Sequence, residues 1–159
     1  MEIVKSLVSP MVAAFSTMSS ASALPFNLTA VNKNVGDKNY ANFICPTIMN
    51  IHMLGDTICI PIIAILLMNF YDIPISNQQF LIFAIYFTLT KFSGAGVPGG
   101  TILVMLRVLE KTLGFTSEMC SLITSIYIVI DCVTSSVNVA GNNIFAIYIY
   151  PMYKKLLKI

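Results

Sequence analysis

The sequence predicts an all-α integral membrane protein, and three observations support this fold class. Charged residues make up only 10% of the chain, whereas they make up about 25% of typical soluble domains. Hydrophobic residues make up 57%, which leaves too few polar side chains to cover a small soluble globule. Four stretches contain no Asp, Glu, Lys or Arg, namely 6–32, 39–55, 73–90 and 132–153. The last is long enough for the roughly 20 residues of a membrane-spanning helix.

The apolar segments follow the same order twice. Each half has a short apolar helix, a turn rich in Ser, Ala or Gly that ends in an aliphatic residue and Pro, another short helix, and a long interrupted helix. The interruptions read H-M-L-G-D at 52–56 and N-V-A-G-N at 138–142. Interrupted spans in matching places of two halves are typical of transporter binding sites. We therefore expect an inverted repeat made of a re-entrant helical hairpin at 1–34, a broken transmembrane helix at 42–70, a second re-entrant hairpin at 79–114 and a broken last transmembrane helix at 119–151.

Basic residues predict the orientation of these segments. The loop at 33–38 has two lysines and the tail at 152–159 has three, whereas the loop at 71–78 has none. Lys and Arg accumulate in cytoplasmic loops. We therefore expect a multi-pass protein of the cell (inner) membrane with a basic cytoplasmic tail. The two hairpins would enter from opposite faces.

The stretch S-G-A-G-V-P-G-G at 93–100 contains the pattern G-x-G-x-x-G. In dinucleotide-binding domains this pattern links a strand to a helix inside a βαβ unit, but here both flanks resemble membrane helices. A turn at membrane depth exposes backbone polar groups, which need protein or a polar cavity around them. The stretch therefore predicts a helical turn that lines a cavity, and a plain tight helix–helix turn fits the same local sequence.

Other functions find little support in the composition. The four cysteines have no C-x-x-C spacing and only one His is present, so we expect reduced packing cysteines rather than a metal centre. The net charge of +2 comes without a basic run outside the tail, so no nucleic-acid partner is expected. We expect neither an enzyme nor an organic cofactor.

Four motifs resemble the dicarboxylate/amino acid:cation symporters, the glutamate transporter family. Residues 14–20 are similar to the serine-rich tip of the family's first hairpin, and 93–100 to the tip of its second. Residues 52–56 are similar to its N-M-D-G-T interruption, and 131–142 to its last helix. The motifs occur in the family's order and cover essentially the whole chain. The resemblance implies symport of an amino acid or a dicarboxylate across the membrane, coupled to sodium or protons.

The resemblance also implies a substrate site. In the family's last helix, the position of Asp131 binds the substrate amino group with help from that of Ser135, and the position of Asn138 binds the α-carboxylate together with the hairpin tips. Thr134 stands where acidic amino-acid transporters have an Arg, and a hydroxyl cannot form that bidentate fork. A neutral amino acid is therefore favoured over glutamate or aspartate. The candidate substrate-binding residues are Ser19, Ser20, Val97, Gly99, Asp131, Thr134, Ser135 and Asn138.

The ion sites implied by the resemblance are altered. Leu54 and Asn142 replace two sodium-site Asp residues of the family, which leaves Met53, Asn138 and Asn142 as weak candidate sodium ligands. His52 and Asp56 are candidates for proton or ion coupling. An acidic side chain in mid-span costs about 2.5–3.5 kcal/mol, so we expect Asp56 to face a cavity or a partner.

The resemblance further implies a C-terminal transport-domain fragment that lacks the N-terminal scaffold helices. Its expected partners are the lipid bilayer, a small-molecule substrate, a separately encoded scaffold fragment and a trimer. Two alternatives stay open: an inactive truncated remnant of such a transporter, and a small membrane interaction subunit without a substrate.

Overall fold

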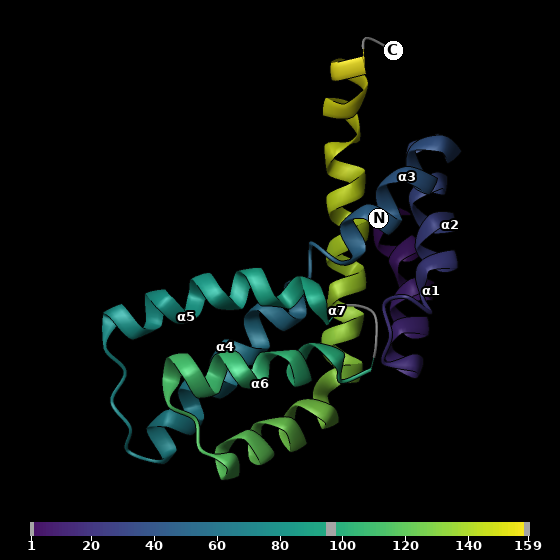
Figure 1. Cartoon of the computed structure of the whole chain (residues 1–159). Coiled ribbons are helices and arrows are strands. Elements are labelled where there is room, and N and C mark those ends of the chain that lie inside the picture. The colour runs from purple at the N-terminus through teal and green to yellow at the C-terminus, as the bar shows by residue number, and fades with distance from the viewer. Residues whose placement is uncertain (1, 95–97, 158–159) are drawn as a thin grey trace.

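The computed structural model describes residues 2–94 and 98–157, and all regular elements in these ranges are helical (Figure 1). The all-α prediction is therefore confirmed. Among the described residues, two segments are long and apolar enough to cross a membrane, Lys38–Phe70 and Ser117–Leu156. The elements are α1 (Glu2–Thr17), α2 (Leu24–Val35), α3 (Lys38–Met49), α4 (Leu54–Phe70), α5 (Asn77–Thr90), the short 3-10 helix η1 (Lys91–Ser93), α6 (Gly100–Leu113) and α7 (Ser117–Leu157).

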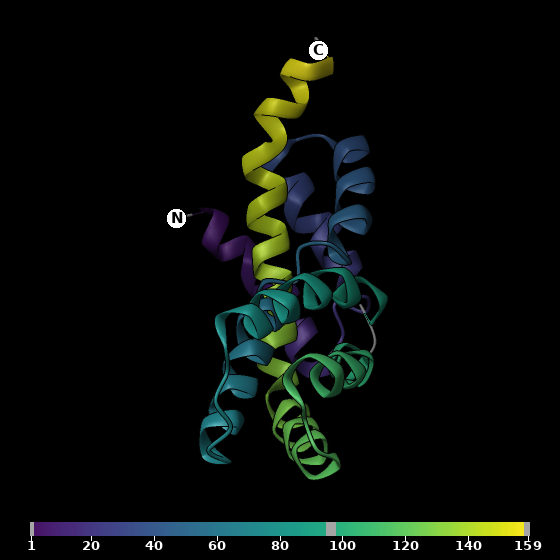
Figure 2. The same cartoon turned by 60° about the vertical axis from the view of Figure 1, so that its left-hand side comes forward.

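Helix α7 is the element against which most of the others pack. It contacts α1, α2, α3, α4 and α6. Helices α2 and α3 lie toward its C-terminal end, whereas α4, α5 and α6 lie toward its N-terminal end (Figures 1 and 2). The middle of α7 therefore lies between two groups of helices.

Helices that are neighbours in the sequence also pack together, and two of these pairs correspond to the predicted hairpins. Helix α1 contacts α2, and α5 contacts α6. Met18 ends the first helix with a positive φ of 51°, and Pro25 occupies the first turn of α2, where its missing N–H does no harm. A capping box of Ser76 and Gln79 starts α5. Whether these pairs are re-entrant hairpins in a bilayer stays a prediction.

The two predicted helix interruptions have different outcomes. Helices α3 and α4 are separated at residues 50–53, so the interruption predicted at 52–56 is present but begins and ends earlier, and Leu54, Gly55 and Asp56 already belong to α4. The break predicted at 138–142 is wrong. Helix α7 is continuous from Ser117 to Leu157 and includes these residues. Gly141 allows close packing there instead, since a Cβ at this position would lie 3.1 Å from Cε1 of His52. Helix α7 does change direction along its length, as its N-terminal part turns away from the rest (Figure 1).

The two largest apolar clusters hold the helix groups together. The larger lies among α4, α5, α6 and the first part of α7 and includes Ile60, Met68, Phe83, Met105 and Ile123. The smaller joins α2 and α3 to the second part of α7 around Tyr40, whose hydroxyl donates a hydrogen bond to the carbonyl oxygen of Ala146 at 2.6 Å.

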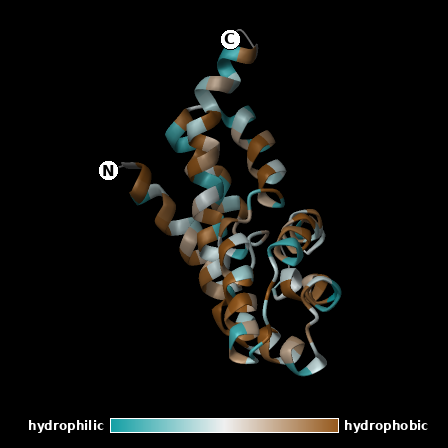
Figure 3. Ribbon diagram, turned by 90° about the vertical axis from the view of Figure 1, so that its left-hand side faces the viewer, coloured by the Kyte–Doolittle hydropathy of each residue, from teal (hydrophilic) through white to brown (hydrophobic). Residues whose placement is uncertain are grey.

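Many outward-facing side chains are also apolar. Figure 3 shows hydrophobic residues along most of the helices. Leu66, Leu81, Leu89 and Val129 are each at least 60% exposed. Large apolar patches are unusual on soluble monomers, and these faces are compatible with a lipid environment.

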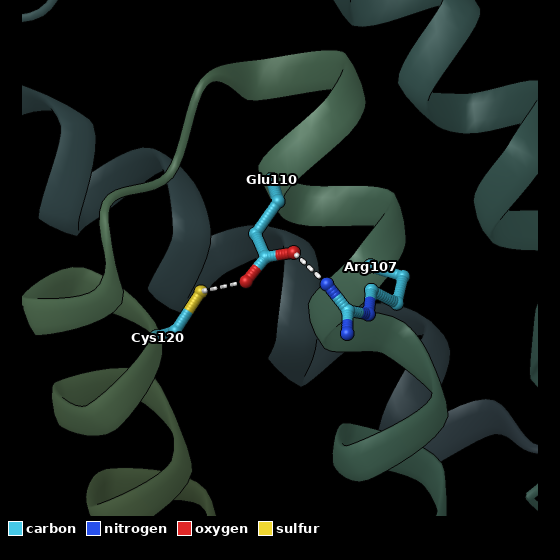
Figure 4. Close-up of polar contacts among 3 residues, drawn as sticks. All are labelled: Arg107, Glu110 and Cys120. Atoms are coloured by element: carbon cyan, nitrogen blue, oxygen red, sulfur yellow. Dashed lines mark hydrogen bonds and ion pairs between the residues drawn. The ribbon is translucent and has the colours of Figure 1, made fainter.

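A polar cluster connects α6 to α7 near the turn between them (Figure 4). The Glu110 carboxylate accepts a hydrogen bond from Arg107 at 3.1 Å and one from the Cys120 thiol at 3.8 Å. Nearby, the Tyr71 hydroxyl donates to Glu118 at 3.2 Å. The Cys120 thiol is free and buried, so this cysteine packs between the two helices.

The close approach of α4 to α7 gives a first prediction. A Cβ at Gly55 would lie 2.4 Å from the carbonyl oxygen of Thr134, a backbone atom with little room to move. We expect Gly55→Ala to lower the free energy of unfolding by about 1–3 kcal/mol, the usual cost of overpacking, measured by thermal melting in detergent. Gly141→Ala is the matched control, because a Cβ there would lie no closer than 3.1 Å to a neighbouring atom and would meet side chains, not backbone. Equal melting temperatures for the two variants would contradict this packing.

Candidate functional site

A small polar pocket lies where α4, α6 and α7 meet the segment that follows α1. Its cavity volume is about 10 Å³, which is room for about one water molecule. Most of its lining side chains carry oxygen or nitrogen atoms. The lining residues are Met18, Ser20, Met53, Asp56, Thr101, Tyr127, Asp131, Ser135 and Asn138.

Asp56 lies in the first turn of α4 and is only 2% exposed. Its carboxylate accepts hydrogen bonds from the Tyr127 hydroxyl, from Nδ2 of Asn138 at 2.8 Å and from Oγ1 of Thr101 at 3.4 Å. The N-terminal end of a helix also favours negative charge. Asp56 is therefore held by donors from both α6 and α7.

Asp131 lies one helical turn beyond Tyr127 and is 5% exposed. Its Oδ2 accepts a hydrogen bond from the backbone N–H of Gly99 at 2.8 Å. Its Oδ1 lies 3.3 Å from the Ser135 hydroxyl and 3.4 Å from that of Thr134. Gly99 has a φ of 64°, a conformation that glycine adopts without steric cost. The residue whose N–H donates to the Asp131 carboxylate is thus held in a backbone conformation that favours glycine.

The Asn138 side chain joins α7 to the start of α4. Its Oδ1 accepts hydrogen bonds from the backbone N–H groups of Gly55 at 2.7 Å and Asp56 at 3.4 Å. These are among the N–H groups that a helix leaves without an internal partner. Because Nδ2 donates to the Asp56 carboxylate, both ends of the amide are used within the protein.

The pocket contains two buried carboxylates without an ion pair. Over residues 2–94 and 98–157, the one salt bridge joins Arg107 to Glu110, far along α6 from the pocket. A buried charge without a countercharge is strongly unfavourable. The pocket is thus suited to a cationic group.

Most of the predicted substrate residues gather at this pocket. Ser20, Asp131, Ser135 and Asn138 line it. Gly99 reaches it through its hydrogen bond to Asp131.

Thr134 and Ser19 are described by the structure but are not among the residues that line the pocket. Thr134 is buried beside Asp131, where its hydroxyl also donates to the Asp131 carbonyl oxygen at 3.1 Å. Ser19 is buried, and its hydroxyl accepts from the N–H of Ser22 at 3.2 Å. Val97 lies outside the described residues.

Only some of the residues predicted to bind or couple to ions line the pocket. Met53 and Asp56 line the pocket, as does Asn138. His52 stacks on Phe145 with ring centroids 5.0 Å apart and does not line it. Asn142 is buried, and neither of its side-chain polar atoms has a hydrogen-bond partner.

The candidate sodium ligands do not fit a metal ion in this arrangement. The Met53 carbonyl oxygen already accepts from both the N–H and the hydroxyl of Thr57, and a carbonyl oxygen has two lone pairs. Oδ1 of Asn138 also accepts twice. Within the described ranges, no three His, Cys, Asp or Glu residues cluster as metal ligands. Only Oδ1 of Asn142 is free among the three candidates.

Three lining residues were missed by the sequence analysis: Met18, Thr101 and Tyr127. Tyr127 had a usable signal, because residues 127, 131, 135 and 138 recur at helical spacing and share one face. Thr101 follows the glycines at the start of α6 and gave no comparable pattern.

An all-helical fold with apolar outer faces and buried acidic side chains is typical of a membrane protein. The sequence profile of the sodium:dicarboxylate symporter family matches residues 1–152. The chain belongs to this family, whose members are transporters and not enzymes.

Relatives in this family include transporters of different amino acids. The chain is 28% identical to neutral amino acid transporter A of Bos taurus over 96% of its own length and 29% of that protein. It is 31% identical to the proton/sodium-glutamate symport protein of Bacillus caldotenax over 91% of its length and 34% of the relative. It is 28% identical to the proton/glutamate-aspartate symporter of Escherichia coli (strain K12) over 88% of its length and 32% of the relative. The chain thus spans about a third of the length of these curated relatives.

A second prediction follows from the contacts of Asp56. Tyr127→Phe removes a hydroxyl that donates to this buried carboxylate. We expect a loss of about 1.5–3 kcal/mol in the free energy of unfolding, as for hydrogen bonds to charged groups, measured by thermal melting. Tyr148→Phe is the matched control, because Tyr148 lies on the same helix and is 75% exposed. If both variants melt together, the hydroxyl does not stabilise Asp56.

Proposed function

We propose that this chain forms the substrate-binding part of a cation-coupled amino-acid symporter of the cell membrane. One observation carries the proposal: Asp56 and Asp131 are buried in one pocket without a salt bridge among the described residues, in a chain that belongs to a symporter family. Charged residues inside membrane segments usually mark substrate or ion pathways.

The pocket offers complementary groups for the two ends of an amino acid. We assign the ammonium group to Asp131, with Ser135 one turn further along the same face. We assign the α-carboxylate to Asn138 and to backbone N–H groups near Ser20 and Gly99. Asn138 would exchange one of its present hydrogen bonds for the substrate, since both ends of its amide are used within the protein.

A neutral amino acid is the substrate class that the lining favours. No Arg or Lys is among the lining residues that the structure describes, so nothing in that set offers a positive charge to a second carboxylate. Thr134, which stands where acidic amino-acid transporters have an Arg, hydrogen-bonds Asp131 with its hydroxyl and carries no positive charge. Of the relatives, one is named for neutral amino acids and others for glutamate.

Coupling in this proposal uses a cation, sodium or a proton, which balances the pocket's acidic charge. Asp56 is the pocket carboxylate left after Asp131 takes the ammonium group. His52 lies next to the pocket residue Met53 and has a buried Nδ1 without a partner, which keeps it a candidate for proton coupling. No transport step is assigned to a bound sodium ion, because the candidate ligands fit one poorly.

The membrane arrangement is part of the same proposal. The α1–α2 and α5–α6 pairs are re-entrant hairpins of an inverted repeat. The C-terminal lysines face the cytoplasm, because Lys and Arg accumulate on that side of membrane proteins. The scaffold helices and the trimer contacts belong to the remaining length of the relatives, supplied together with this chain or by a separate one. The whole chain moves against that scaffold.

Ligand binding tests the proposal directly. We expect a neutral amino acid such as alanine or serine to raise the melting temperature of the purified protein, because a ligand that binds only the folded state stabilises it. Glutamate should raise it less. Asp131→Asn should remove the shift, whereas Asp72→Asn, which alters an exposed loop residue, should keep it.

The alternatives predict other results. No shift with any amino acid would favour an inactive remnant or an interaction subunit without a substrate. A shift that survives in Asp131→Asn would mean that the amino acid binds elsewhere. Uptake of the radiolabelled amino acid into proteoliposomes, with the scaffold segment of a relative co-reconstituted, then distinguishes binding from transport.

A further inference from the structure

A groove between helices α5 and α6 shares no lining residue with the acidic pocket and has no role in the proposed function. Its volume is about 530 Å³, within the range of about 300–1,000 Å³ that is typical of small-ligand sites. Ile82 and Tyr86, one turn apart on α5, line one side, and Val104 and Val108, one turn apart on α6, line the other. This part of the groove is therefore largely apolar.

Two basic side chains, Arg107 and Lys111, line the same groove. They are one turn apart on α6 and so lie on the same helix face, where like charges repel each other. The Arg107 guanidinium contacts Glu110 at 3.1 Å through Nη1 (Figure 4), and a guanidinium has five N–H donors. Within residues 2–94 and 98–157, Lys111 takes part in no salt bridge. Two positive charges and one negative charge leave a net charge of +1 beside the groove.

The surface around the groove is apolar, which favours a lipid as its occupant. Tyr86 lines the groove and is still 55% exposed, and Leu81 and Leu89 of the same helix are exposed as well. A soluble anion would lose its hydration in such a surface, whereas basic pockets beside transmembrane helices are typical sites for anionic lipid head groups. A helix with its side chains is about 10–12 Å across, so the groove suits a single acyl chain better than a partner helix.

We propose that the groove between α5 and α6 binds one anionic phospholipid. The phosphodiester lies between Arg107 and Lys111, whose N–H groups donate charge-assisted hydrogen bonds to its oxygens, and an acyl chain lies along Ile82, Tyr86 and Val104. The single negative charge of a phosphodiester balances the net charge beside the groove. This inference goes beyond the proposed function, because it requires neither the acidic pocket nor a substrate.

Thermal melting of the full chain in detergent tests the proposal, with equal amounts of phosphatidylglycerol or phosphatidylcholine that have the same acyl chains. The wild type should melt about 2–4 °C higher with phosphatidylglycerol, because a lipid that binds the folded state stabilises it. Arg107→Gln and Lys111→Gln together should abolish this difference. Lys154→Gln and Lys155→Gln together remove the same charge from the exposed end of α7 and should keep it.

Four results of this experiment would overturn the proposal. They are a wild type that melts alike with both lipids, a groove variant that keeps the difference, and a tail variant that loses it. The fourth is an equal shift with glycerol phosphate, a soluble head group without acyl chains, which would mean that the two cations bind free phosphate groups.

The absence of Trp from the sequence allows a second test that leaves both basic side chains in place. Tyr86→Trp places a single indole in the groove, and Leu81→Trp places one on the exposed surface of α5 outside it. Phosphatidylglycerol with brominated acyl chains should quench the fluorescence of Tyr86→Trp at a several-fold lower lipid ratio than brominated phosphatidylcholine. Both lipids should quench Leu81→Trp equally. Equal quenching of Tyr86→Trp by the two lipids would show that the groove does not select an anionic lipid.

Discussion

The position of the pocket depends on the hydrogen bonds between Asn138 and the first turn of α4. This side chain satisfies the N–H groups of Gly55 and Asp56 and also donates to the Asp56 carboxylate. Its neighbour Thr134 leaves room for α4 only because residue 55 has no side chain. A helix start can therefore be buried against another helix in an apolar surrounding, where unpaired backbone groups are costly.

The pocket combines a rigid part and a part held by fewer contacts. Helices α4 and α7 pack through the larger apolar cluster and present Asp56, Tyr127 and Asp131 from regular helix. Gly99 and Thr101, at the start of α6, reach the same carboxylates through one hydrogen bond each. Segments with few buried apolar contacts open at lower free energy than packed helices. This difference is suited to a site in which one wall is fixed and another moves.

Much of the fold was predictable because the bilayer imposes a strong pattern on sequence. The uncharged stretches indicated the helices, and the acidic residues within them indicated a cavity, whereas Ser135 and Asn138 were predicted from the resemblance to a family. The unbroken course of α7 was not predictable from N-V-A-G-N, because a glycine in a helix serves close packing as readily as a break. Thr101 was missed because only its packing against α4 brings it near Asp56. The occupied Met53 carbonyl likewise depends on the geometry of one helix turn.

The backbone N–H of Gly99 has a consequence for binding at Asp131. This N–H is bonded to the same carboxylate that an incoming ammonium group would seek, so backbone and ligand compete for one acceptor. An arriving solute must share Asp131 with this amide or displace it, and displacement would loosen the start of α6. Solute binding at Asp131 and the stability of the first turn of α6 would then be linked through one shared acceptor.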